Sequence, residues 1–87
     1  MNLNELRDEI DKNDDKLIKL FICRMELVKQ IAYIKKEAGS LTEDPKREEE
    51  ILNRILPNLD DEITPHAHTL FTTLFNISRK YQNELNF

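Results

Sequence analysis

Apolar residues recur along residues 3–36 at steps of three and four, which is the spacing of one face of an α-helix. The pattern predicts a single helix over this range, about 50 Å long at about 1.5 Å per residue. A compact chain of 87 residues has a radius of gyration of only about 12 Å, so the helix extends beyond any core that its own chain can build. We therefore expect an intertwined oligomer. The apolar seam has two rows, Leu3, Ile10, Leu17 and Ile31, and Leu6, Leu20, Leu27 and Ile34.

The second predicted helix covers residues 44–56 and is marked at both ends. Asp44 is a favourable N-cap residue, and Pro45 suits the first helical position that follows it. Pro57 cannot continue a helix and is expected to end it. The segment before this helix contains Gly39, the single glycine of the chain, and is predicted to be a loop.

The third predicted helix covers residues 64–85. Thr64 and Pro65 repeat the combination of a capping residue and a proline, after a loop rich in Asn and Asp. The order is thus long, short and medium, in one all-α domain over residues 1–87. The apolar residues expected to be buried on the third helix are Ala67, Phe71, Leu74, Tyr81 and Leu85.

The composition supports the predicted helices and excludes some classes of function. Leu, Ile, Glu and Lys are abundant whereas Val and Gly each occur once, which disfavours a β-sheet. The net charge of −4 disfavours nucleic acid as a partner, because no global positive field attracts a phosphate backbone. No run approaches the roughly 18 apolar residues of a membrane span, and the N-terminus does not resemble a signal peptide. With Cys23 as the single cysteine, we expect a cytoplasmic protein that binds neither membrane nor nucleic acid.

Two cationic residues of the long helix are candidate ligand-binding residues. Arg24 replaces an apolar residue of the seam, where a charge is costly to bury unless it is matched. The sequence leaves three roles open for Arg24: it fixes the register of an oligomer, it forms an interhelix ion pair, or it binds an anionic ligand. Lys35 returns to nearly the same face about 16 Å further along the axis. The two can bracket a small dianion, although Lys35 is alternatively a solvated residue near the helix end.

The other two helices carry further polar candidates. Glu48 extends the apolar stripe formed by Ile51, Leu52 and Ile55, so its side chain is expected to face inward. Asp44, by contrast, is already explained by the preference of acidic residues for first helical turns. Ser78 and Gln82 lie one turn apart on the third helix, with Ser78 in a buried row. A serine at such a place commonly bonds to its own helix, and Gln82 is alternatively exposed.

Arg7 precedes Arg24 by about 25 Å along one straight helix. It reaches a ligand held by Arg24 and Lys35 only if a second subunit supplies it. Signatures of metal and nucleotide sites are missing from the sequence, because His66 and His68 point about 200° apart on a helix and no glycine-rich phosphate loop occurs. We predict no metal site.

In order and spacing, these residues resemble the all-helical chorismate mutase family over residues 3–85. The resemblance implies an intertwined homodimer of three-helix subunits with two equivalent active sites. It further implies the rearrangement of chorismate to prephenate, on the route to phenylalanine and tyrosine, without any cofactor. The matching positions are Leu6, Arg7, Ile10, Asp11, Asp14, Leu17, Leu20, Arg24, Leu27, Ile31, Lys35, Asp44, Arg47, Glu48, Ser78 and Gln82.

The resemblance also assigns the cationic residues to the dianionic substrate. Arg24, together with Arg7 of the partner subunit, is expected to clamp the two carboxylates and so to orient the reacting carbons. Ser78 is expected to support one carboxylate. Arg47 is expected to hold the end of the pocket at the second helix.

The remaining roles concern the ether oxygen and the ring hydroxyl. Lys35 and Gln82 are expected to donate to the ether oxygen, on which negative charge grows as the C–O bond breaks. Glu48 is expected to accept a hydrogen bond from the ring hydroxyl, helped by the backbone N–H of Asp44.

Two other functions remain open from the sequence. An isochorismate–pyruvate lyase shares this fold and needs the same cationic clamps. A non-catalytic helical dimerisation or regulatory module explains the long seam. It does not explain Arg24 or the ordered set of Lys35, Glu48 and Gln82. Formation of prephenate, release of pyruvate, or no turnover distinguishes the three.

Overall fold

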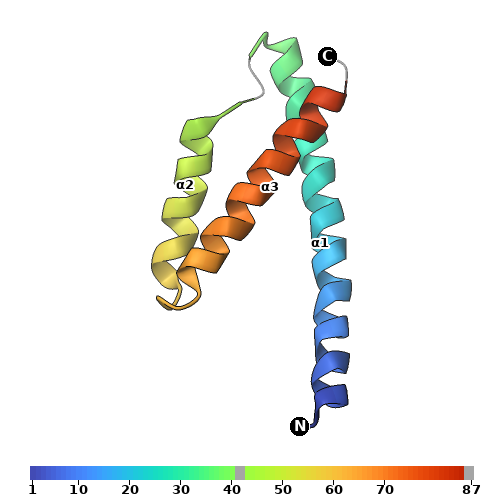
Figure 1. Cartoon of the computed structure of the whole chain (residues 1–87). Helices are drawn as coiled ribbons and strands as arrows, with labels where there is room; N and C mark the ends of the chain where they lie inside the picture. Colours follow the sequence, from blue (N-terminus) through green and yellow to red (C-terminus); the bar gives the residue numbers. More distant parts are fainter. Residues whose placement is uncertain (41–42, 86–87) are drawn as a thin grey trace.

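The computed structural model of the chain, which describes residues 1–40 and 43–85, contains three α-helices (Figure 1). They are α1 (Leu3–Glu37), α2 (Pro45–Ile55) and α3 (Thr64–Glu84), with a short 3₁₀ helix η1 (Leu56–Asn58) after α2. The described residues form no strand, so the predicted all-α class with three helices is confirmed. Residues 41–42 of the first predicted loop and residues 86–87 of the predicted domain lie outside the described part.

Both ends of α1 are closed by local hydrogen bonds. The Asn2 side chain accepts a 2.9 Å hydrogen bond from the backbone N–H of Glu5 and thereby caps the first turn. At the other end Gly39 has a φ of +69°, a conformation that glycine adopts without steric cost. The backbone N–H groups of Gly39 and Ser40 then bond back to Lys36 and Lys35, which terminates the helix in a Schellman turn.

The two proline-marked helix starts behave differently. Asp44 caps α2 as predicted, because its carboxylate accepts a 3.2 Å hydrogen bond from the backbone N–H of Arg47. The expected capping role of Thr64 is wrong. Its hydroxyl instead donates a 2.9 Å hydrogen bond to the backbone carbonyl of Asp60, and Ile63 occupies the N-cap position. The reason is that the chain already turns at Asp60, whose carbonyl also accepts from the backbone N–H of Thr64.

Pro57 does not end the second helical segment abruptly. The α-helix stops at Ile55, and the chain continues as η1 with Pro57 inside its first turn. A proline is tolerated in a first turn because the N–H that it lacks has no partner there. The turn redirects the chain from α2 towards α3.

α3 lies between the other two helices and contacts both of them (Figure 1). The small core consists of Val28 and Ala32 on α1 and Phe75 on α3, with the side chain of Gln82 beside them. The methyl side chain of Ala32, which is fully buried, allows the two helices to approach closely. The sequence prediction omitted Phe75 from the buried residues. The apolar residues that it did select on α3 are only partly buried in the single chain, namely Ala67, Phe71, Leu74, Tyr81 and Leu85.

The N-terminal half of α1 projects away from α2 and α3 (Figure 1), and residues 1–20 are all exposed. The radius of gyration is accordingly 16.1 Å, and the chain extends 54 × 26 × 15 Å. All eight apolar residues of the seam are between 48% and 68% exposed. Within the described part of the chain, no helix is both long and apolar enough to cross a membrane.

Candidate active site

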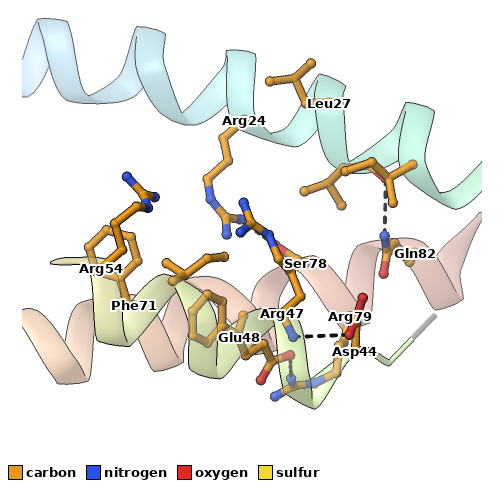
Figure 2. Close-up of a pocket in the computed structure, with 14 residues that line it drawn as sticks. Arg24, Leu27, Asp44, Arg47, Glu48, Arg54, Phe71, Ser78, Arg79 and Gln82 are labelled. Atoms are coloured by element: carbon orange, nitrogen blue, oxygen red, sulfur yellow. Dashed lines mark hydrogen bonds and ion pairs between the residues drawn. The ribbon is translucent and has the colours of Figure 1, made fainter. Parts of the chain in front are cut away.

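A cavity of about 310 Å³ lies between the three helices where α3 crosses α1 (Figure 2). Its apolar wall includes Val28, Ile51, Phe71 and Phe75, and the two phenylalanine rings lie 6.3 Å apart, tilted by 56°. Six of the eight predicted site residues line the cavity, although they come from three separate helices. These six are Arg24, Asp44, Arg47, Glu48, Ser78 and Gln82.

Arg24 points from α1 towards α3, where its Nη1 donates a 2.6 Å hydrogen bond to the Ser78 hydroxyl (Figure 2). Ser78 in turn donates a 2.8 Å hydrogen bond to the backbone carbonyl of Leu74. The serine therefore bonds to its own helix, as one alternative predicted, and also receives the arginine. Because no carboxylate among the described residues pairs with Arg24, the interhelix ion pair is absent from the single chain.

The charge of Arg24 is only partly solvated. Burial lowers the pKa of the Arg24 guanidinium below its ordinary value. An arginine nevertheless remains protonated at neutral pH, since its ordinary pKa lies far above pH 7. Arg24 thus presents a positive charge whose single protein partner among the described residues is neutral, a suitable arrangement for binding an anion.

Gln82 is buried, with 6% of its surface exposed, which makes the exposed alternative wrong. Its Nε2 donates a 3.2 Å hydrogen bond to the backbone carbonyl of Val28 on α1. This bond uses one of the two hydrogens of the amide group and fixes the side chain at the cavity wall (Figure 2). The second hydrogen is available to a ligand.

Glu48 faces inward from α2, as predicted, and forms an ion pair with Arg79 of α3 (Figure 2). Arg79 also donates to the side-chain carbonyl of Asn76, one turn earlier on the same helix. Sequence reasoning missed Arg79 entirely. Its position directly after Ser78 gave a weak signal, whereas its pairing with Glu48 depends on how α2 and α3 are packed.

Lys35 and Asp44 meet at the end of the cavity where α2 begins. The Nζ of Lys35 lies 3.6 Å from the Oδ2 of Asp44, and Asp44 lines the cavity while Lys35 does not. Asp44 thus both caps α2 and brings a cation of α1 close to the cavity. Lys35 thus lies beside the cavity without lining it, and its role in the site stays a prediction.

Arg7 does not line the cavity. It is exposed on the projecting half of α1, about 25 Å from Arg24 along the helix. Arg7 therefore lies outside the cavity of its own chain, and its predicted contribution from a partner subunit stays a prediction.

Positive charge predominates on the cavity wall. Four arginines line it, Arg24, Arg47, Arg54 and Arg79, against the carboxylates of Asp44 and Glu48. The protein as a whole carries a net charge of −4, so the positive charge is local to the cavity. A concave site of one sign concentrates its field and attracts an oppositely charged ligand. The arrangement is suited to a small molecule with more than one anionic group.

Arg54 is a further lining residue that sequence reasoning missed. It follows Arg47 by seven residues, which places the two on one face of α2, and this spacing could have identified it. The guanidinium of Arg54 has no hydrogen bond or ion pair within residues 1–40 and 43–85. Arg47, in contrast, forms an ion pair in which its Nη1 lies 3.5 Å from Oε2 of Glu50. Arg54 is therefore a cation with its full charge available at the cavity.

Known proteins that are similar in sequence to this chain point to one family. The chain matches the family described as chorismate mutase type II over residues 6–83. It is 43% identical over 53 residues to a chorismate mutase of Methanocaldococcus jannaschii, covering 61% of this chain and 54% of that protein. It is also 43% identical over 54 residues to a bifunctional chorismate mutase/prephenate dehydratase of Aquifex aeolicus, covering 62% of this chain and 15% of that protein. No solved structure gives a significant match.

The matched segments span about half of the first relative and a smaller share of the second. The family match, in contrast, extends over most of this chain and includes all six predicted residues that line the cavity. The chain therefore belongs to the chorismate mutase type II family.

Proposed function

We propose that this chain is a chorismate mutase, an isomerase that rearranges chorismate to prephenate in the biosynthesis of phenylalanine and tyrosine. The observation that carries the proposal is the meeting of Arg24, Ser78, Gln82 and Glu48 in one cavity with an excess of positive charge. Family membership supplies the substrate class, and the cavity supplies side chains that suit a dianion with a hydroxyl group.

The reaction breaks an ether C–O bond and forms a C–C bond within one molecule, with no transfer of a proton. Acceleration must then come from holding the reactive conformer and from stabilising the charge that develops on the ether oxygen. Arg24, supported by Ser78, binds one carboxylate through its remaining N–H donors. Arg47 closes the same cavity from the second helix.

The bond-breaking end of the site is formed by Gln82 and Lys35. The free amide hydrogen of Gln82 donates to the ether oxygen, and this bond strengthens as negative charge grows there. Lys35, held beside Asp44, is the second donor. Glu48 accepts from the ring hydroxyl on the opposite wall, helped by the backbone N–H of Asp44.

We further propose a single chorismate mutase domain that acts as an intertwined homodimer, with each site completed by Arg7 of the partner subunit. The exposed seam of α1 supports this, because soluble monomers rarely leave a continuous apolar stripe in water. A second concavity of about 360 Å³ between α1 and α3 is lined by Leu17, Ile18, Phe21 and Leu70, among others, and adds to the same apolar surface. We place the enzyme in the cytoplasm, where a free thiol such as Cys23 stays reduced.

The test is a direct assay. Purified protein is mixed with chorismate, the loss of its ultraviolet absorbance is followed, and the product is identified by mass spectrometry. We expect prephenate. Release of pyruvate from isochorismate, without prephenate from chorismate, would identify the lyase instead. A folded dimer that turns over neither compound would overturn the proposal and would indicate a non-catalytic module.

A further inference from the structure

We propose that Arg79 is a positioning residue that holds Glu48 in the orientation in which it receives the ring hydroxyl of the substrate. The inference rests on the proposed function, and it concerns a residue that none of the sequence patterns selected. Arg79 acts through Glu48 in this account and makes no contact of its own with the reacting atoms.

The contacts of Arg79 hold its guanidinium at two points. Nη1 donates to Oε2 of Glu48 on α2, and Nη2 donates to Oδ1 of Asn76 on α3. The Asn76 bond fixes the plane of the guanidinium, which in turn fixes the carboxylate that it faces. Figure 2 shows the Arg79 guanidinium paired with that carboxylate of Glu48. Both members of the ion pair are mostly withdrawn from water, with 29% and 26% of their side chains exposed. An ion pair at this depth is screened less than one on the surface.

The pairing leaves Glu48 suited to a specific task. Oε2 is occupied by Arg79, and Oε1 remains free to accept a hydrogen bond. A carboxylate held in one orientation loses less entropy when it binds a hydroxyl than one that rotates freely. The geometry therefore prepares one oxygen of Glu48 for the ligand.

Arg79 also neutralises the charge of Glu48 at the cavity wall. An isolated carboxylate on this wall would repel a dianionic substrate. Arg79 balances the charge of Glu48, so that Arg24 and Arg54 act on the ligand without an opposing field. Arg79 is the least available of these three guanidiniums, because it already holds a carboxylate. This distinguishes a positioning residue from a carboxylate clamp.

A purely structural role must also be tested. Among the residues that the structure describes, no other side-chain hydrogen bond joins α2 to α3. Loss of Arg79 could therefore loosen α2 without any specific effect on Glu48. Activity per folded protein has to be separated from stability, and the dependence on Glu48 has to be measured.

The experiment is a double-mutant cycle with Arg79→Met, Glu48→Gln and the combined variant. In the native background we expect Arg79→Met to lower kcat/KM about tenfold, within the range of coupling between contacting groups. In the Glu48→Gln background the same substitution should change kcat/KM less than about twofold, because its target is already absent. Lys80→Met is the matched control. It removes the same charge from the neighbouring, exposed residue of α3 and should leave kcat/KM unchanged.

Arg79→Lys tests the geometry separately from the charge. It keeps the positive charge but lacks the fork that reaches Glu48 and Asn76 together, so we expect kcat/KM between those of Arg79→Met and the native enzyme. If Arg79→Met does not fold, as judged by circular dichroism, the cycle of Arg79→Lys with Glu48→Gln gives the same readout of coupling.

Three results are decisive. Equal losses of kcat/KM in the native and Glu48→Gln backgrounds would overturn the inference, because Arg79 would then act independently of Glu48. An unchanged kcat/KM per folded protein in Arg79→Met, with only a lower Tm, would also overturn the inference. Arg79 would then only stabilise the packing of α2 against α3. In both cases the native enzyme still turns over chorismate. Failure of the native enzyme itself would instead refute the proposed function, and the inference with it.

Discussion

Arg24 on α1 and Ser78 on α3 are 54 residues apart in sequence, yet the arginine Nη1 lies 2.6 Å from the serine Oγ. The proton of the serine hydroxyl is already committed to the Leu74 carbonyl, so the oxygen can only accept from the arginine. The bond turns the guanidinium towards the cavity and uses one of its five N–H donors. This arrangement suits the binding of an anion, and it depends on both residues.

Arg24→Ala should therefore remove substrate binding and orientation together. We expect kcat/KM to fall at least about a hundredfold, equivalent to about 2.7 kcal/mol of transition-state stabilisation. Ser78→Ala keeps the guanidinium but loses its support, so the expected loss is smaller, about fivefold. Steady-state kinetics on both variants measures the difference.

Thermal unfolding of the same variants checks whether Arg24 is instead a structural residue. Removal of a partly buried charge should not lower the Tm, because alanine also has a high helix propensity. An Arg24→Ala protein that unfolds or dissociates, but keeps native turnover per folded dimer, would show that Arg24 fixes the oligomer register.

Arg54 offers a test of the cavity's positive charge. Arg54→Gln and Lys46→Gln each remove one positive charge from an exposed side chain of α2, but only Arg54 lines the cavity. We expect Arg54→Gln to raise KM about fivefold at low ionic strength, with kcat little changed, and the effect to shrink as salt is added. Lys46→Gln should leave KM unchanged. Equal effects from both substitutions would mean that only the overall charge of the protein matters.

Complementation tests the shared site. Arg7→Ala and Lys35→Ala chains should each be inactive, because each lacks one part of every site. After subunit exchange, a mixed dimer contains one site with both lesions and one with neither, so activity should return to about a quarter of the native level for random mixing. The mixed dimer is followed by native mass spectrometry, which establishes the exchange. No recovery of activity, with mixed dimers present, would refute the contribution of Arg7 in trans.

Gln82→Glu should introduce a pH dependence, whereas we expect kcat/KM of the native protein to be nearly flat across neutral pH. A neutral amide donates to the ether oxygen at any ordinary pH, whereas an ionised carboxylate repels the charge that grows there. The reference pKa of glutamate is about 4.3, and burial beside the carbonyl of Val28 raises it in the folded state. We expect kcat/KM of the variant to be low at pH 8 and to rise steadily towards pH 5. A flat profile identical to that of the native enzyme would remove Gln82 from the bond-breaking end of the site.

The same substitution makes a stability prediction with a defined sign. A carboxyl whose pKa is raised on folding favours the folded state below its unfolded pKa, and this contribution is lost as pH rises through the folded pKa. The Tm of Gln82→Glu should therefore approach that of the native protein at pH 5 and fall below it at pH 8. Circular dichroism at each pH allows kcat/KM to be expressed per folded enzyme.

Local patterns of the sequence were sufficient for the helices. The spacing of three and four along α1, and the Asp44–Pro45 start of α2, act within one or two helical turns and hardly depend on the rest of the chain. The predicted length of α1 is also greater than a compact chain of this size can pack against. This length indicated that the apolar seam is not buried within the single chain, and the structure shows those residues exposed.

Contacts between helices were decided only by the tertiary structure. The pairing of Glu48 with Arg79 joins residues 31 apart, and the hydrogen bond from Gln82 to the Val28 carbonyl joins residues 54 apart. No local preference determines which residue of α2 faces which residue of α3, because that depends on the angle and register at which the helices pack. The sequence by itself therefore determined which helices form and which residues are candidates for the site. The packing of α3 between α1 and α2 determined which of them meet, and it added Arg54 and Arg79 to the cavity.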